Sequence, residues 1–284
     1  MTARLARRSL LVGSLLAPLP AAAVLVDRGI LPGQGRLHRA LGGCDLPAPP
    51  PAPAAGPVVR GVFDSVRRRR TVSFVIRYPQ STSPGDRLPV CLALHGYGGT
   101  ALDVSPPGAS FAVAAMDGGP GYWHPHEADD PLGALLDEFL PLLAARGLDV
   151  GRAAVAGWSM GGYGALLCGL SRPGRFAAVV ASSPAIWRSY EEARRVNAGA
   201  FDSAAEWARY DVLARAGELR GVRLRVDCGV DDPFAPAVRE LRRRLPDPGV
   251  VHLSKGCHDG AFWGHAPPAQ VRFIEEALVS AKRT

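Results

Sequence analysis

The stretch Val155-Ala-Gly-Trp-Ser-Met-Gly-Gly162 decides the fold of this chain. Apolar residues precede it and a small, apolar segment follows it to Leu170, a pattern typical of a buried strand, a tight turn and a helix. Gly157-Trp-Ser-Met-Gly161 fits G-x-S-x-G, in which small residues let the strand and helix approach closely. Such a turn projects the hydroxyl of Ser159 toward the helix N-terminus, where partial positive charge favours an oxyanion. We predict that Ser159 is a nucleophile; the alternative is a structural Gly-rich turn.

A second Gly-rich segment, His95-Gly-Tyr-Gly-Gly99, follows an apolar strand predicted over Leu88–Leu94. It resembles the HGGG-type loop that donates backbone N–H groups to the oxyanion of acyl transfer. We assign the two donors to the backbone N–H groups of Tyr97 and Met160. We expect His95 to brace the loop rather than to act as a base.

Two late predicted strands each run into a loop that carries a candidate catalytic side chain. Val222–Gly229 precedes Asp232, and Val250–Leu253 precedes His258. With Ser159, these residues follow the chain order Ser, Asp, His of an α/β-hydrolase. We predict that His258 is the general base and that Asp232 holds its imidazole in the required tautomer.

Each of these two residues has a competitor in the sequence. Asp231 competes as the acid, and we favour Asp232 because it lies one residue further around the turn and Pro233 stiffens its position. His265, just beyond the loop of His258, competes as the base.

The order of predicted elements indicates an α/β-hydrolase fold, with a mostly parallel central sheet flanked by helices and a small helical cap insertion at about residues 184–219. The other strands are predicted over Val58–Val66, Thr71–Tyr78, Phe111–Met116, Leu148–Gly157 and Phe176–Ser182, and helices over Pro131–Arg146, Val238–Leu245 and Pro268–Lys282. The catalytic domain would span residues 58–284.

We expect the substrate to contact four residues: Gly96, Trp123, Trp158 and Trp263. Trp123 lies in the predicted loop Tyr122–Asp130, whose two histidines, His124 and His126, and three acids are an alternative metal site. The H-x-H spacing has no further ligand at a helical interval. We therefore expect no metal and no cofactor, and we expect this loop to line the acyl pocket.

The formal charge of +7 is unevenly distributed over the 284 residues. Residues 1–70 hold eleven Arg and three Asp, whereas the rest of the chain holds 22 basic and 23 acidic residues. A nucleic-acid-binding protein concentrates its basic residues on a folded face, so we do not expect a nucleic-acid partner. We expect the run Arg67–Arg70 to be a solvated hairpin tip, with contact to an anionic surface as the alternative.

The N-terminus has the pattern of an export signal. Basic residues precede an apolar run over residues 10–26 and a small-residue site, so we expect residues 1–26 to be a signal peptide or an N-terminal anchor, with possible membrane association. Arg7-Arg8 suggests twin-arginine export. We expect residues 27–57 to be a Pro-rich linker, in which residues 45–57 are extended and lack packed structure. We therefore expect an exported protein, extracellular or in the cell envelope.

The five cysteines contain no C-x-x-C pair. Cys91, Cys168 and Cys228 lie in apolar runs and are interpreted as buried small hydrophobic residues. In an exported protein Cys228 or Cys257 could form a disulfide, but the sequence does not identify the partner.

Three blocks of the sequence resemble the putative-esterase family of α/β-hydrolases, which includes esterase D, feruloyl esterases and mycobacterial mycolyltransferases. They are Gly157–Gly162, Asp227–Phe234 and Gly256–Trp263, and the resemblance extends from about Val58 to Ala281. The leader and linker resemble those of exported actinobacterial members. The resemblance implies that Ser159, Asp232 and His258 form the catalytic triad.

Three functions are consistent with these residues. The leading hypothesis is a serine carboxylesterase that hydrolyses a small-molecule or envelope acyl ester through a covalent acyl-enzyme. The same intermediate could transfer its acyl group to another hydroxyl, which would make the chain an acyltransferase. The third alternative is a non-catalytic binding module on a hydrolase fold.

Overall fold

The computed structural model describes residues 37, 40–49, 56–104 and 110–280. The predicted signal or anchor segment, residues 1–26, lies outside the described residues. Among the helices of the described ranges, none combines the length and apolarity needed to cross a membrane.

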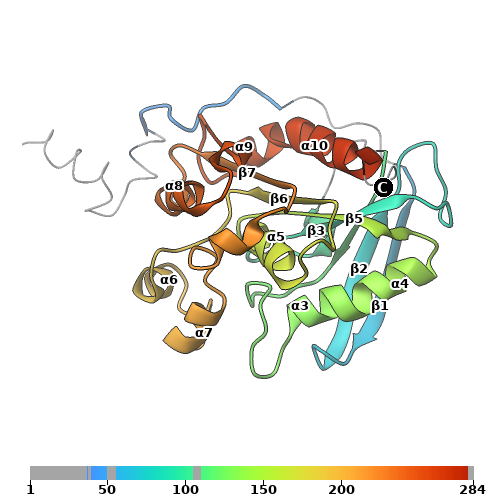
Figure 1. The fold of residues 1–284 in the computed structure, drawn as a ribbon. Coiled ribbons are helices and arrows are strands. Elements are labelled where there is room, and N and C mark those ends of the chain that lie inside the picture. The colour runs from blue at the N-terminus through green and yellow to red at the C-terminus, as the bar shows by residue number, and fades with distance from the viewer. Residues whose placement is uncertain (1–36, 38–39, 50–55, 105–109, 281–284) are drawn as a thin grey trace, which may run out of the picture.

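An eight-stranded sheet forms the centre of the molecule, in the order β1-β2-β4-β3-β5-β6-β7-β8 (Figure 1). β2 pairs antiparallel with β1 and β4, and all the later neighbours pair in parallel. The strands are β1 (Val58–Ser65), β2 (Arg70–Arg77), β3 (Pro89–Leu94), β4 (Ala112–Met116), β5 (Asp149–Trp158), β6 (Ala178–Ser182), β7 (Leu224–Gly229) and β8 (Val251–Ser254). The predicted α/β-hydrolase architecture is confirmed.

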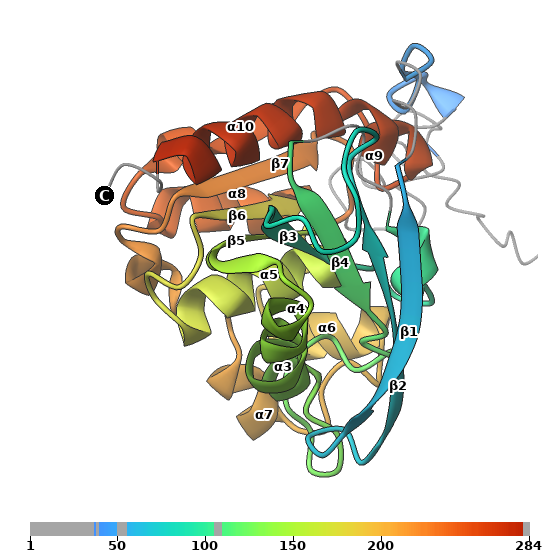
Figure 2. The same ribbon diagram turned by 90° about the vertical axis from the view of Figure 1, so that its right-hand side faces the viewer.

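Helices cover both faces of the sheet, as Figure 2 shows for α10 on one face and α3, α4 and α5 on the other. They are α3 (Pro131–Gly133), continued by a π-helical stretch (Ala134–Phe139) and α4 (Leu140–Ala145), α5 (Met160–Ser171), α6 (Tyr190–Val196), α7 (Ala204–Arg209), α8 (Ala235–Arg244), α9 (Gly260–His265) and α10 (Pro267–Ser280). Short 3₁₀ turns occupy Ala101–Asp103, Ala216–Leu219 and Pro248–Val250. α9 lies where the sequence predicted only a loop.

Alternating side chains of the strands divide the core between these two layers, because successive residues of a strand point to opposite faces. Val113 and Val180 pack with Ile274 of α10 on one face. Val155 and Val179 pack with the buried side of α5 on the other face. Strands buried on both faces explain the continuous apolar runs in the sequence.

The parallel arrangement positions the candidate site. Because β3, β5, β7 and β8 run in the same direction, the loops that follow them emerge at one edge of the sheet. The segments after these four strands are those that the sequence analysis selected: 95–99, 159–162, 230–234 and 255–259. The cap helices α6 and α7 lie between β6 and β7, within the predicted insertion.

The hairpin tip at Arg67–Arg70 is not fully solvated, so the sequence expectation is wrong for Arg68. Arg68 is 3% exposed, and its Nε and Nη2 donate to the two carboxylate oxygens of Asp129 at 2.7 and 2.8 Å. A guanidinium can be buried in this way because the paired carboxylate compensates its charge. The hairpin is therefore fastened to the loop that precedes α3.

Candidate active site

Ser159 occupies a strained turn between β5 and α5. Its backbone has φ 54° and ψ −121°, a conformation that a residue with a side chain rarely adopts. A Cβ on Gly157 would overlap the carbonyl oxygen of Gly161, and a Cβ on Gly161 would overlap that of Leu94. The two glycines of the G-x-S-x-G pattern are therefore required by close backbone contacts.

Hydrogen bonds around the turn hold this strained backbone in place. The N–H of Ser159 donates to the carbonyl of Ser182 at 2.9 Å, and the carbonyl of Ser159 accepts from Ala185 N–H at 3.0 Å. Both partners follow or end β6, the neighbouring strand. The position of Ser159 is thus fixed by two adjacent parallel strands and not by its own loop alone.

The structure brings Ser159, His258 and Asp232 together in one hydrogen-bonded chain. His258 Nε2 lies 2.9 Å from Ser159 Oγ, and His258 Nδ1 lies 2.8 Å from Asp232 Oδ2. Since a carboxylate only accepts, Nδ1 carries the proton and Nε2 is free to accept from the serine hydroxyl. This tautomer is the one that a general base needs.

The carboxylate of Asp232 is held in place beside His258 by burial and by a second hydrogen bond. Its side chain is fully buried, and its second oxygen, Oδ1, accepts from the N–H of Phe234 at 2.8 Å. Of the two candidate acids, Asp232 is therefore the one that contacts His258. The competing base, His265, instead bonds through Nε2 to the carbonyl of Pro47.

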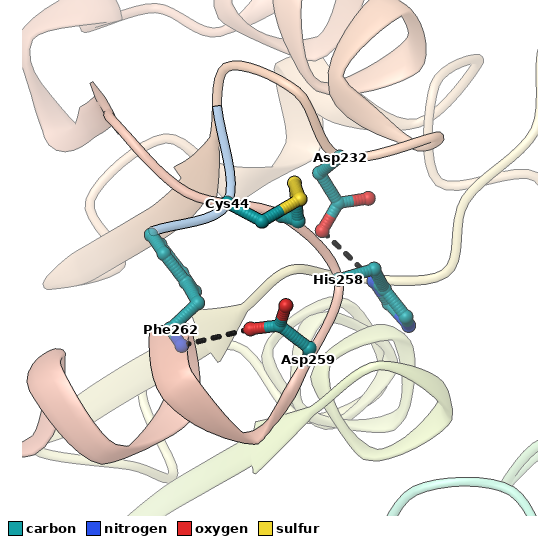
Figure 3. Close-up of a disulfide and its surroundings, with 6 residues drawn as sticks. Cys44, Asp232, His258, Asp259 and Phe262 are labelled. Carbon is teal, nitrogen blue, oxygen red and sulfur yellow. Dashed lines mark hydrogen bonds and ion pairs between the residues drawn. A yellow bond between two sulfur atoms is a disulfide. The ribbon is translucent and has the colours of Figure 1, made fainter. Parts of the chain in front are cut away.

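The loop of His258 is anchored by a disulfide whose partner the sequence did not identify. Cys257, adjacent to His258, is bonded to Cys44, 213 residues away in the sequence. Figure 3 shows this bond beside the Asp232–His258 hydrogen bond. On the other side of His258, Asp259 caps α9 by accepting from the N–H of Phe262 at 3.1 Å. His258 thus lies between two residues that are held in place, Cys257 by the disulfide and Asp259 by its cap on α9.

The N-terminal segment that carries Cys44 packs on the same loop. Pro47 accepts the hydrogen bond from His265, and a Cβ on Gly264 would lie 3.2 Å from Pro49. The part of the Pro-rich linker that is described therefore contacts the catalytic domain, contrary to the expectation that it lacks packed structure. The sequence does contain a signal for this disulfide. Cys44 and Cys257 are the two cysteines that lie outside apolar runs, so they are the two that remain to pair.

The other three cysteines are free and buried, as predicted. Burial raises the pKa of the Cys91 and Cys168 thiols to about 12. Burial, followed by the nearby Asp232 carboxylate, raises the pKa of the Cys228 thiol as well. None of the three is a candidate nucleophile, because the reactive form is the thiolate.

His95 braces the Gly-rich loop beside the nucleophile. Its Nε2 accepts from Gly118 N–H at 2.9 Å, so Nδ1 carries the proton and donates to the carbonyl of Gly96 at 2.8 Å. Burial lowers the pKa of His95, which keeps the ring neutral. In a planar trans peptide, the N–H of Tyr97 then points away from the His95 ring.

The loop is also close to the nucleophile. A Cβ on Gly96 would lie 3.6 Å from Ser159 Cβ and 2.9 Å from the indole nitrogen of Trp158. Met160 begins α5, so its N–H has no acceptor within the helix. An oxyanion hole made by the N–H groups of Tyr97 and Met160 therefore stays a prediction.

The three tryptophans among the predicted substrate-contacting residues divide into two groups. Trp263 lies with its ring centroid 5.0 Å from that of His258, and with Trp158 it lines a cavity of about 340 Å³ between the sheet and α10. Trp123 is instead fully buried and donates from its indole N–H to the carbonyl of His95 at 3.2 Å. Trp123 supports the Gly-rich loop from behind and is not exposed to a substrate.

Comparisons with known proteins agree with this fold. Residues 124–245 match the family described as "Putative esterase". Over 120 residues the chain is 31% identical to an iron(III) salmochelin esterase of Escherichia coli O6:H1, a match that covers 40% of this chain and 28% of that relative's length.

Two solved structures share the fold over most of this chain. A ferulic acid esterase superposes with a TM-score of 0.63 at 21% identity, covering 78% of this chain and 98% of the other. An S-formylglutathione hydrolase from Agrobacterium tumefaciens superposes with a TM-score of 0.64 at 18% identity, covering 79% and 98% of the two chains. The predicted α/β-hydrolase fold is confirmed, and the resemblance to the esterase family is found over residues 124–245.

Proposed function

We propose that this α/β-hydrolase, whose residues 124–245 match the family described as "Putative esterase", is a serine carboxylesterase that acts through Ser159, His258 and Asp232. The observation that carries the proposal is the pair of hydrogen bonds, 2.9 and 2.8 Å long, that joins the three side chains. The substrate class is a small-molecule acyl ester, because the proteins that the chain resembles are esterases and a thioester hydrolase named for small-molecule substrates.

The acylation step uses the tautomer described above. Ser159 Oγ attacks the ester carbonyl carbon while His258 Nε2 takes the hydroxyl proton, and Asp232 stabilises the resulting imidazolium. The carbonyl oxygen becomes an oxyanion that accepts from the N–H groups of Tyr97 and Met160. The ester C–O bond then breaks, and the departing alkoxide takes the proton from His258.

Deacylation repeats these roles with water. His258 Nε2 takes a proton from a water molecule, whose oxygen attacks the acyl carbon attached to Ser159. The second oxyanion uses the same two N–H donors. When the acyl–Oγ bond breaks, Ser159 recovers its proton from His258, and the carboxylic acid leaves.

Ester turnover with matched serine variants tests this proposal. Wild-type chain, Ser159→Ala and Ser81→Ala, an exposed serine in the loop after β2, are assayed on p-nitrophenyl esters of increasing acyl length. Ser159→Ala should lose about 10⁴-fold or more in kcat, and Ser81→Ala should match wild type. A fluorophosphonate probe should add one adduct to wild type and none to Ser159→Ala. Equal turnover by the two variants would contradict the assignment.

We also propose that the protein is exported. The Cys44–Cys257 disulfide supports this, because such bonds persist in oxidising compartments. The leader pattern of residues 1–26 supports it from the sequence. Cell fractionation with mass spectrometry of the mature N-terminus tests the proposal. A reduced, uncleaved chain confined to the cytoplasm would contradict it.

A further inference from the structure

A cluster of two histidines and an acid lies outside the site described above. His124 and His126 come from the loop between β4 and α3, and Glu206 comes from cap helix α7. One ligand atom from each residue lies within 4.8 Å of the other two. The His124 side chain is fully buried, and those of His126 and Glu206 are 14% and 13% exposed. The proposed esterase mechanism uses none of these groups.

The same ring nitrogen is fixed in both histidines. Nε2 of His124 lies 2.8 Å from the carbonyl oxygen of Ala200, and Nε2 of His126 lies 2.9 Å from that of Gly121. A carbonyl oxygen only accepts, so a proton on Nε2 satisfies each of these contacts, and in His124 this is the shorter of the two ring contacts with a carbonyl. Metal-binding histidines are commonly oriented in this way, with one nitrogen donating to a backbone carbonyl and the other facing the ion.

The two remaining nitrogens face acceptors. Nδ1 of His126 lies 3.3 Å from Glu206 Oε1 and 3.2 Å from Asp202 Oδ2. Nδ1 of His124 lies 3.8 Å from the same Glu206 oxygen and 3.2 Å from the carbonyl of Pro125. Nitrogen lone pairs and carboxylate oxygens thus surround a common point, an arrangement that calls for a positive charge between them.

One added proton does not satisfy the cluster. A proton on Nδ1 of His126 would bond to Asp202 or Glu206 and leave Nδ1 of His124 facing only acceptors. A metal cation at the common point could contact Nδ1 of both histidines and Glu206 Oε1 at once.

The separations and the donor types favour one class of cation. In a tetrahedral zinc site with bonds of about 2.0–2.2 Å, the ligand atoms lie roughly 3.4 Å apart. Here Glu206 Oε1 lies 3.3 Å from His126 Nδ1 and 3.8 Å from His124 Nδ1. Two imidazole nitrogens with carboxylate oxygens suit zinc, whereas calcium and magnesium prefer oxygen ligands alone.

We propose that His124, His126 and Glu206 form a structural site for a zinc-class divalent cation. A water molecule would complete the four-coordinate shell, and Asp202 Oδ2, 3.2 Å from His126 Nδ1, lies beside the site. The site would fasten the loop after β4 to cap helix α7.

Aromatic neighbours orient the buried ligand. The ring of His124 stacks on Phe201, with centroids 4.8 Å apart and planes 6° apart, and on Tyr210, with centroids 4.9 Å apart. These rings hold the imidazole plane while the Ala200 carbonyl fixes its rotation. A site of this kind is preorganised, so little conformational entropy is lost when the cation binds.

Zinc binding to the tag-free full chain tests the proposal. The chain is stripped with a chelator, Zn²⁺ alone is added back, and bound metal and Tm are measured. Wild type should bind one equivalent, and its Tm should rise by about 5 °C or more once zinc reaches a hundredfold excess over Kd. His126→Ala and Glu206→Gln should lose both effects. Ser159→Ala and His252→Ala, an exposed histidine of β8, should retain them.

Cobalt supplies a readout that does not depend on the stability of the variants. Co²⁺ in a tetrahedral nitrogen and oxygen shell absorbs visible light strongly, so the cobalt-loaded wild type should show such bands and zinc should abolish them. Substoichiometric zinc binding, absence of these bands, or full zinc binding by a folded Glu206→Gln would overturn the proposal. Failure of esterase activity would not affect it, because the ligands belong to a different set of residues.

Discussion

The molecule contains two histidine–carboxylate clusters that differ in which ring nitrogen is fixed. In the first, Asp232 holds Nδ1 of His258, so Nε2 is left facing the hydroxyl of Ser159. In the second, backbone carbonyls hold Nε2 of His124 and His126, so the two Nδ1 atoms face a shared carboxylate. A basic nitrogen aimed at a hydroxyl can take a proton, whereas two aimed at one carboxylate can bind a cation. Residue type alone does not distinguish these roles.

The two clusters are also attached to the fold in different ways. The loop of His258 is fixed covalently by the Cys44–Cys257 bond. The loop of His126 is fixed by ionic and hydrogen bonds, because His126 N–H donates to the carbonyl of Asp129, whose carboxylate holds Arg68. Covalent attachment suits a side chain that must move a proton within a fixed distance, whereas a metal ligand can be drawn into place by the ion.

The sharpest contrast is expected from removing one histidine of each cluster. His258→Ala should lower kcat on a p-nitrophenyl ester by about 10⁴-fold or more, since it removes the proton acceptor for Ser159. His126→Ala should lower kcat less than about tenfold, because it contacts no reacting atom. Steady-state kinetics measure both, and equal losses would remove the distinction between the clusters.

Removing the carboxylate of Asp232 should likewise lower kcat far more than removing that of Glu206. Asp232→Asn should lower kcat by about 10⁴-fold, because an amide no longer enforces the Nδ1–H tautomer of His258. Asp231→Asn is the matched control, since the carboxylate that contacts His258 belongs to Asp232. Glu206→Gln should keep most of the activity and lose zinc binding. A larger loss at Asp231 than at Asp232 would reassign the acid.

Removing the covalent anchor should lower stability more than activity. The double variant Cys44→Ala/Cys257→Ala should lose about 2–4 kcal/mol of unfolding free energy, as expected for a disulfide that closes a long loop. Its kcat should fall a few-fold, because His258 keeps its bond to Asp232. Urea titration and kinetics measure the two effects. Addition of a thiol reductant should change the wild type and leave the double variant unchanged.

Breaking the ion pair between Arg68 and Asp129 should lower the unfolding free energy less than removing the disulfide does. Arg68→Met leaves Asp129 with one cationic partner, Arg70, and should cost about 1–3 kcal/mol of unfolding free energy. Arg69→Met, at the exposed neighbouring position, should change it by less than about 0.5 kcal/mol. Urea titration compares the two variants. Equal values would mean that burial of Arg68 contributes nothing to stability.

The smallest effect concerns pH. The pKa of His95 is lowered by burial, so the unfolded chain binds a proton at higher pH than the folded chain does. The stability that depends on neutral His95 is present above about pH 6.5 and declines as pH falls below that value. Urea titrations from pH 8 to pH 5 should show this decline. Its slope should be shallower in His95→Gln, and an unchanged slope would exclude His95 as a cause.

The strand and helix order, the elbow and the three proposed catalytic residues could be predicted from the sequence because their signals are local. Apolar runs mark buried strands, Gly157 and Gly161 mark the tight turn, and strand ends mark where Asp232 and His258 emerge. Parallel pairing then brings these ends together without any further information.

Only the tertiary structure decided which distant residues meet. Cys44 pairs with Cys257 across 213 residues, Arg68 is buried against Asp129, and Glu206 approaches His124 and His126 from the cap. The spacing of apolar residues along the sequence does not predict these contacts, because each depends on how two distant segments pack against each other in the folded chain. The H-x-H sequence lacked a third ligand at helical spacing, and the fold supplies one from another element. Local sequence set the elements and their order, while long-range packing set the partners of the loops.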